Sequence, residues 1–140
     1  MKLDESARAL IGRGANATLV TLNADGSPQV SVVWVALQPG EHDDELVVAH
    51  LSDSYRKVRN VRRDPRVALT VVADPHGPTL RQYLWVSGNA RIVEGGAPAL
   101  LRQLSDALTP GSGFPPDDAP DGFLTRITVD KVGGLGPWAQ

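Results

Sequence analysis

The chain has 140 residues and a mass of 14.9 kDa, the size of one domain with an ordinary hydrophobic core. With 41% hydrophobic and 21% charged residues the composition excludes a disordered chain, and no stretch approaches the roughly 20 apolar residues of a membrane helix. The N-terminus lacks a signal-peptide core and there are no cysteines, so we expect a cytoplasmic protein without disulfides or soft metal sites.

The positive charge of the chain is concentrated in one segment. Net charge is -2 from 14 basic and 16 acidic residues, which argues against a dedicated nucleic-acid binder. Six of the basic residues nevertheless fall between Arg56 and Arg66, with Asp64 as the only acid among them. Arginines predominate, and their forked donors suit phosphate or carboxylate. The segment is therefore the first candidate for a binding site.

In chain order, the first half predicts one helix and three strands. Apolar residues at helical spacing indicate a helix within the first dozen residues, ended by Gly12 and Gly14. Residues 17–22 and 28–37 are typical of strands joined by a turn at residues 23–26, and Pro28 fits the first position of its strand. A polar loop over residues 38–44 precedes a strand at residues 45–50.

The second half alternates helices and strands. The segment from Ser52 to Ser54 offers a helix cap, and Pro65 stops that helix at Asp64. Strands are predicted at residues 67–73, 81–93 and 123–130, loops at 74–78 and 109–122, and a helix at 98–108. Six strands with helices at a few connections indicate a mainly β, α+β domain over residues 1–140: a small antiparallel barrel with short flanking helices.

The start of the basic helix is the strongest sign of chemistry. With Ser54 as the cap, Arg56 and Lys57 fall in the first helical turn, where the helix dipole disfavours cations by a few tenths of a kcal/mol each. An anion would resolve this conflict, because free N–H groups, two cations and cap hydroxyls together form a phosphate site. The alternative is a solvated basic surface balanced by the acidic loops.

Two further features can contribute to a ligand site. Gln29 and Ser31 place polar groups on one side of an apolar strand, where they are either solvent-exposed or hydrogen-bonded to a planar heterocycle. Core packing accounts for Trp34. Tyr83 and Trp85 lie on an otherwise polar strand face and are better candidates for an interface or a ligand wall.

Familiar catalytic sets are absent from the sequence. No thiol, nucleophile elbow, Walker loop or dinucleotide fingerprint occurs, and His42, His50 and His76 are scattered, so we expect no metal site. His50 precedes the basic helix, where a structural role is favoured over proton transfer. These absences disfavour hydrolases but not redox enzymes, because a flavin-type cofactor itself carries the hydride.

Two motifs resemble a known family. The hairpin Asp25-Gly26-Ser27-Pro28-Gln29-Val30-Ser31 and the helix Arg56-Lys57-Val58-Arg59-Asn60-Val61-Arg62-Arg63-Asp64-Pro65-Arg66 resemble those of the pyridoxamine-phosphate-oxidase-like split β-barrel proteins. Within these the sequence is most similar to the actinobacterial flavin/deazaflavin oxidoreductase B group, which uses the deazaflavin coenzyme F-420 in place of FMN. The resemblance implies a six-stranded split barrel and a homodimer with cofactor sites at the subunit interface.

The resemblance also implies which residues bind the cofactor. Arg56 and Lys57 would hold its phosphate, with Asn60 supporting that segment, while Tyr55 stands where relatives can have another basic residue. Arg59 and Arg63 are available for a glutamate tail. The residues expected beside the ring are Pro28, Gln29, Val30, Ser31 and Val33, then His50, Leu51 and Ser52, with Tyr83 and Trp85 from the second subunit.

These implications leave several functions to compare. The first is an F-420-dependent oxidoreductase that passes a hydride from the reduced cofactor to an unsaturated small organic acceptor. The second keeps the fold but uses FMN, and the third is a carrier that binds cofactor without turnover. A nucleic-acid binder would require strongly salt-dependent binding to generic DNA or RNA.

Overall fold

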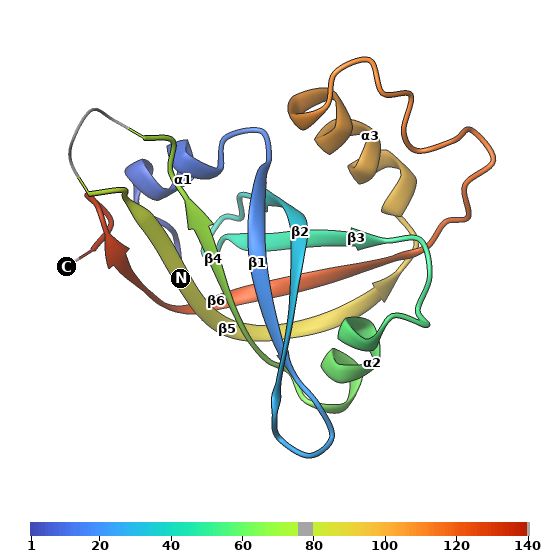
Figure 1. Cartoon of the computed structure of the whole chain (residues 1–140), viewed down its shortest axis with the longest axis horizontal. Coiled ribbons are helices and arrows are strands. Elements are labelled where there is room, and N and C mark those ends of the chain that lie inside the picture. The colour runs from blue at the N-terminus through green and yellow to red at the C-terminus, as the bar shows by residue number, and fades with distance from the viewer. Residues whose placement is uncertain (76–79, 140) are drawn as a thin grey trace.

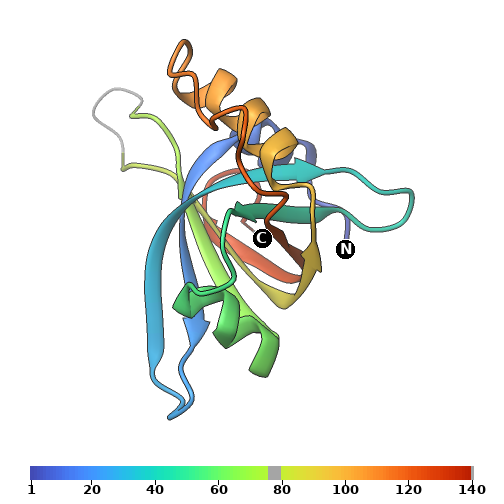
Figure 2. The ribbon, with the colours of Figure 1, turned by 90° about the vertical axis from the view of Figure 1, so that its right-hand side faces the viewer.

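The computed structural model describes residues 1–75 and 80–139, and it is built around a closed antiparallel barrel (Figures 1 and 2). Six strands follow one another around the barrel in the order β1-β2-β3-β6-β5-β4. The expected six-stranded split barrel with flanking helices is therefore confirmed. The elements are α1 (Glu5–Ile11), β1 (Ala15–Leu22), β2 (Pro28–Gln38), β3 (Glu45–His50), α2 (Arg56–Arg63), β4 (Arg66–Val72), β5 (Tyr83–Glu94), α3 (Ala97–Leu108) and β6 (Phe123–Leu135).

Alternating burial along the strands forms the barrel core. In β5 the side chains of Leu84, Val86 and Ala90 point inward and are buried, whereas Tyr83 and Trp85 point outward, as the sequence pattern predicted. Inward-pointing residues of the other strands fill the same interior, and α1 adds to this core from one end. None of the helices within the described ranges is long and apolar enough to cross a membrane.

The largest difference from the predicted elements is in the last strand. It was expected to end at Asp130, yet β6 continues to Leu135 through Gly133 and Gly134. After a β-bulge beside Gly88, this extension pairs with the first residues of β5, which compensates for the low strand propensity of the two glycines. The other boundaries move by one or two residues, and the part of the predicted 74–78 loop beyond residue 75, with His76, lies outside the described residues.

The extended strand positions Trp138. Its side chain is 6% exposed and joins the barrel core, and the indole Nε1 donates a hydrogen bond of 2.8 Å to the Tyr83 carbonyl. The C-terminal segment thus closes one end of the barrel beside β5.

Candidate functional site

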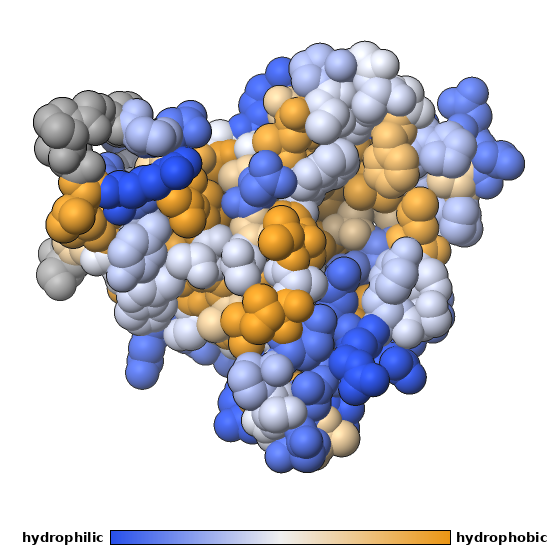
Figure 3. Space-filling view, in the orientation of Figure 1, coloured by the Kyte–Doolittle hydropathy of each residue, from blue (hydrophilic) through white to orange (hydrophobic). Residues whose placement is uncertain are grey.

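The barrel is split between β2 and β3, and the split forms a pocket. These strands pair only where residues 36–38 meet residues 45–47. Beyond that point β2 follows β1 and β3 follows β6, so the two strands diverge. A pocket of about 350 Å³ opens in the gap, and the surface in Figure 3 is hollowed between β2 and α3.

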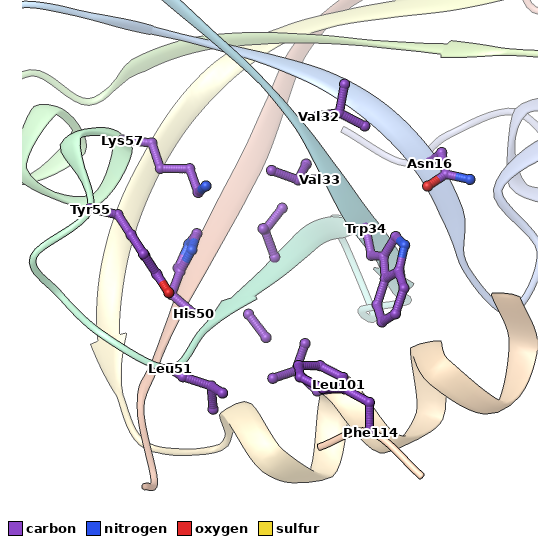
Figure 4. A pocket seen from close by; sticks show the side chains of 12 residues that line it. Asn16, Val32, Val33, Trp34, His50, Leu51, Tyr55, Lys57, Leu101 and Phe114 are labelled. Carbon is purple, nitrogen blue, oxygen red and sulfur yellow. The ribbon is translucent and has the colours of Figure 1, made fainter. Parts of the chain in front are cut away.

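The pocket walls come from four parts of the fold (Figure 4). β1 and β2 form one side, β3 and the residues after it form the other, and α2 and α3 with the segment beyond α3 approach the two ends. The lining residues are Asn16, Val32, Val33, Trp34, Val48, Ala49, His50, Leu51, Tyr55, Lys57, Leu101 and Phe114. Five of them, Val33, His50, Leu51, Tyr55 and Lys57, are among the residues that the sequence predicted.

Lys57 is the one charged side chain in this lining. Its ammonium lies 5.1 Å from the centre of the Tyr55 ring, which provides a cation–π contact. Burial lowers the pKa of Lys57, because the apolar surroundings penalise its charged form. An anion bound here would offset that penalty.

The N-terminus of α2 has no side-chain cap. The predicted cap at Ser54 is wrong: Tyr55 is the N-cap residue and makes no side-chain capping bond. The hydroxyl of Ser54 is hydrogen-bonded at 2.8 Å to that of Ser52 instead. This end of the helix therefore combines an uncapped first turn with the Arg56 and Lys57 side chains, which favours an anion.

The basic residues of α2 divide into paired and unpaired groups. Arg62 forms an ion pair of 2.9 Å with Asp53, and Arg66 forms one of 2.7 Å with Asp64 just after the helix. Within residues 1–75 and 80–139, Arg56, Lys57 and Arg59 form no such ion pair.

Arg63, expected to be available for a glutamate tail, is occupied by other contacts. Its guanidinium donates to the Leu22 carbonyl and, at 3.0 Å, to Asn60 Oδ1. Arg59 is exposed and remains available for that role.

Asn60 fixes α2 against the β1–β2 hairpin. The side chain is only 3% exposed, and its Nδ2 donates hydrogen bonds of 3.0 Å to Thr21 Oγ1 and Asn23 Oδ1. Thr21 in turn donates a bond of 2.9 Å to Gln29 Oε1. Asn60 thus holds the basic helix in place, and the predicted ring residue Gln29 belongs to this network and does not line the pocket.

His50 is buried on the β3 side of the pocket. A hydrogen bond of 2.7 Å joins its Nε2 to Thr125 Oγ1, and its ring centre lies 6.5 Å from that of Tyr55. Burial, with a smaller contribution from the Lys57 charge, lowers the pKa of His50 to about 4. The imidazole is neutral near pH 7, as expected for a structural histidine.

Several other residues predicted to bind the cofactor do not line the pocket. Pro28 and Val30 are exposed near the start of β2, Ser52 follows the lining residue Leu51, and Arg56 is exposed at the start of α2. Ser31 differs from these. Its Oγ is buried without a hydrogen-bond partner in the described part of the chain, so it has a free polar atom to offer a ligand.

Tyr83 and Trp85 lie far from the pocket within one chain. Direct register joins Val32 to Thr18, Thr18 to Thr70 and Thr70 to Trp85, which is three inter-strand steps or roughly 14 Å across the sheet. A single chain therefore does not bring these two aromatic residues to the pocket.

The aromatic end of the pocket was not predicted from the sequence. Trp34 was assigned to the core, but it is only partly buried and lies in the pocket wall, where its ring meets that of Phe114 at 6.1 Å and 83°. Strand alternation could have shown this, because Val33 and Val35 on either side of Trp34 point inward. Phe114 lies in an irregular segment, and no sequence pattern predicted its position.

A barrel split in this way, with a basic helix at the gap, defines the class of split β-barrel proteins. The sequence matches the family model described as pyridoxamine 5'-phosphate oxidase over residues 3–135, and the chain belongs to this flavin-binding family. Within the described residues, no group of three His, Cys, Asp or Glu side chains is placed to hold a metal ion.

Solved structures agree with this assignment. An F-420 reductase is 30% identical with a TM-score of 0.75, and the alignment covers 94% of this chain and 98% of that one. A conserved hypothetical protein from Mycobacterium tuberculosis is 22% identical with a TM-score of 0.68, over 95% of this chain and 84% of that one. A heme storage protein from Vibrio cholerae is 18% identical with a TM-score of 0.63, covering 97% and 96% of the two chains. The last two similarities concern the fold alone.

Proposed function

We propose that the protein is an F-420-dependent oxidoreductase that transfers a hydride between the reduced deazaflavin and an unsaturated small organic substrate. The observation that carries the proposal is the pocket in the split barrel, which ends at Lys57 beside the uncapped start of α2. The similarity to an F-420 reductase at 30% identity favours the deazaflavin over FMN.

The residues present fit such a cofactor. Lys57, Arg56 and the first N–H groups of α2 would hold its phosphate, and Arg59 is placed for an acidic tail. Val33 gives the ring apolar cover, and the unpartnered hydroxyl of Ser31 is a hydrogen-bonding group nearby on the same strand. When bound, the cofactor supplies the hydride, whereas the chain binds, orients and shields it.

We further propose a homodimer that completes the site. The outer face of the sheet exposes apolar side chains on four strands: Val30 and Val32 of β2, at 60% and 72% exposure, with Val72 of β4, Tyr83 and Trp85 of β5, and Leu135 of β6. Hydrophobic side chains also gather over β1 and β2 in Figure 3. A second copy on this face would bury them and would give Tyr83 and Trp85 a route to the partner's pocket, which one chain cannot provide.

FMN and a carrier role are the alternatives. FMN also has a phosphate, so the α2 end of the pocket accepts it by the same contacts. A carrier would need the binding site but no acceptor. Binding affinities therefore distinguish F-420 from FMN as the cofactor, and substrate turnover distinguishes an enzyme from a carrier.

The proposal is tested by titrating the protein with F-420 and with FMN side by side, following fluorescence. We expect F-420 to bind in the low micromolar range or tighter and FMN to bind far more weakly. Tight retention of FMN through purification would refute the choice of cofactor. Stoichiometric F-420 binding without turnover of any enone, quinone or biliverdin-like tetrapyrrole would establish the carrier.

The site is tested by Lys57→Gln, with Arg66→Gln as the matched control because Arg66 is exposed and paired with Asp64. A hydrogen bond to a charged group contributes about 1.5–3 kcal/mol, so Lys57→Gln should weaken F-420 binding roughly 10- to 100-fold. Arg66→Gln should leave the affinity within about twofold. Unchanged affinity in Lys57→Gln would mean that the phosphate lies elsewhere.

A further inference from the structure

The pocket has two chemically different ends. Lys57, Tyr55 and His50 lie together at one end, whereas Trp34 and Phe114 lie at the other (Figure 4). No charged side chain lines the aromatic end in the part of the chain that the structure describes. One pocket therefore offers a cationic site and a separate apolar surface.

The aromatic end is built by a contact between distant segments. Phe114, in the irregular stretch after α3, meets Trp34 of β2 in an edge-to-face arrangement with ring centres 6.1 Å apart. Leu101 of α3 is 8% exposed and lines the same pocket. Phe114 itself remains 40% exposed, so it is accessible to a ligand.

This end is not needed for the cofactor. The residues expected to bind the cofactor come from β2, β3, β5, α2 and the segment before α2, and none comes from α3 or residues 109–122. With the phosphate at α2 and the ring beside Val33 and His50, the surface formed by Trp34, Leu101 and Phe114 is left for a second molecule.

We propose that Phe114, backed by Trp34 and Leu101, is a specificity-determining residue that selects a neutral, planar, largely apolar hydride acceptor. The inference rests on the proposed function. The acceptor gains a hydride at one end of its conjugated system and a proton from water at the other, a two-electron reduction matched by two-electron oxidation of the reduced deazaflavin. Phe114 contributes a flat contact surface and takes no part in proton transfer.

Charge accounts for the preference for a neutral acceptor. With Lys57 held by the cofactor phosphate, an anionic acceptor at the aromatic end would lose water without gaining a cation. A neutral ring avoids this penalty.

The experiment compares Phe114→Ala with Phe123→Ala, which removes the other phenylalanine of the chain, outside the pocket. Calorimetry measures two dissociation constants. The first is for F-420. The second is for menadione, titrated into protein saturated with oxidised F-420, because the oxidised cofactor transfers no hydride. The charged probe is 1,4-naphthoquinone-2-sulfonate. Should F-420 fail to bind, the menadione titration is made on the protein alone, so that failure of the proposed function is seen separately.

We expect Phe114→Ala to weaken menadione binding about fivefold, typical of one lost aromatic contact, with F-420 affinity changed less than twofold. Phe123→Ala should change neither, and the wild type should bind menadione at least tenfold more tightly than the sulfonate. An equal loss of F-420 affinity in Phe114→Ala would assign the aromatic end to the cofactor and overturn the proposal. Unchanged menadione affinity, or equal binding of the two quinones, would also overturn it.

Discussion

His50 makes the stability of the fold depend on pH. The unfolded chain protonates this histidine near its ordinary pKa of 6.5, whereas burial keeps the pKa of native His50 near 4. Between these values only the unfolded state takes up the proton, so acidification favours unfolding. The stabilising contribution is complete above pH 6.5 and is lost as the pH falls through 4.

The size of the effect follows from that interval. From 6.5 to about 4 the full contribution is roughly 3 kcal/mol, since one pKa unit corresponds to about 1.36 kcal/mol. Roughly 2 kcal/mol of it is lost already at pH 5, above the ordinary pKa of most carboxyl groups. A comparison between pH 7 and pH 5 therefore separates the effect of His50 protonation from that of the carboxyl groups.

The assay is urea unfolding at pH 7 and pH 5, at one protein concentration, for the wild type, His50→Gln and His42→Gln. Glutamine cannot titrate. Between pH 7 and pH 5 the free energy of unfolding should therefore fall by about 2 kcal/mol less in His50→Gln than in the wild type. His42 has 88% of its side chain exposed, and its replacement should leave the wild-type dependence unchanged. Parallel pH dependences for the wild type and His50→Gln would refute the assignment of a neutral, buried imidazole.

Two further substitutions test the ion pair between Arg8 and Asp44 and the outer face of the sheet. Asp44 is fully buried, and its carboxylate accepts two hydrogen bonds from the Arg8 guanidinium, at 2.7 and 3.1 Å. Asp44→Asn should therefore lower the free energy of unfolding by about 3 kcal/mol, whereas Asp43→Asn at the exposed neighbouring site should lower it by less than about 1 kcal/mol. Equal losses for the two variants in denaturant titrations would contradict this prediction. A Cβ at Gly133 would lie 2.5 Å from the Trp85 ring, so Gly133→Ala must displace the indole. If the proposed homodimer forms through this face, its dissociation constant should rise about tenfold in sedimentation equilibrium, with unchanged circular dichroism. An unaltered constant would contradict a role of Trp85 in the proposed interface.

The sequence was most informative where one residue type repeats at a fixed period. The alternation of apolar and polar residues predicted β5 and the inner and outer faces of this strand, because every second residue packs into the same core. The same alternation in β2 places Trp34 opposite the inward-pointing Val33 and Val35, so the core packing expected for Trp34 disagrees with its position in the strand. The full length of β6 depends on pairing with β5, a distant partner that local propensity at Gly133 and Gly134 cannot reveal.

The candidate site was predictable to a similar extent. The cationic end comes from one continuous segment, and Lys57, Tyr55, Leu51 and His50 are all found around the pocket. The aromatic end joins residues about 80 positions apart in sequence, Trp34 and Phe114, through a segment without regular structure. No periodicity exists in such a segment, so the contact could only come from the fold.

The structure also refines the meaning of the basic cluster. Six cations in eleven residues predict a strong local field, but Arg62 and Arg66 are neutralised by nearby aspartates and Arg63 supports the β1–β2 hairpin. Arg56 and Lys57 are left in the first turn of α2, where the helix dipole opposes them and no side chain caps the N–H groups. A bound anion would relieve both penalties at once, whereas solvent relieves neither for the half-buried Lys57. The field that remains is confined to one helix end beside one pocket, which suits a single phosphate and not the extended backbone of a nucleic acid.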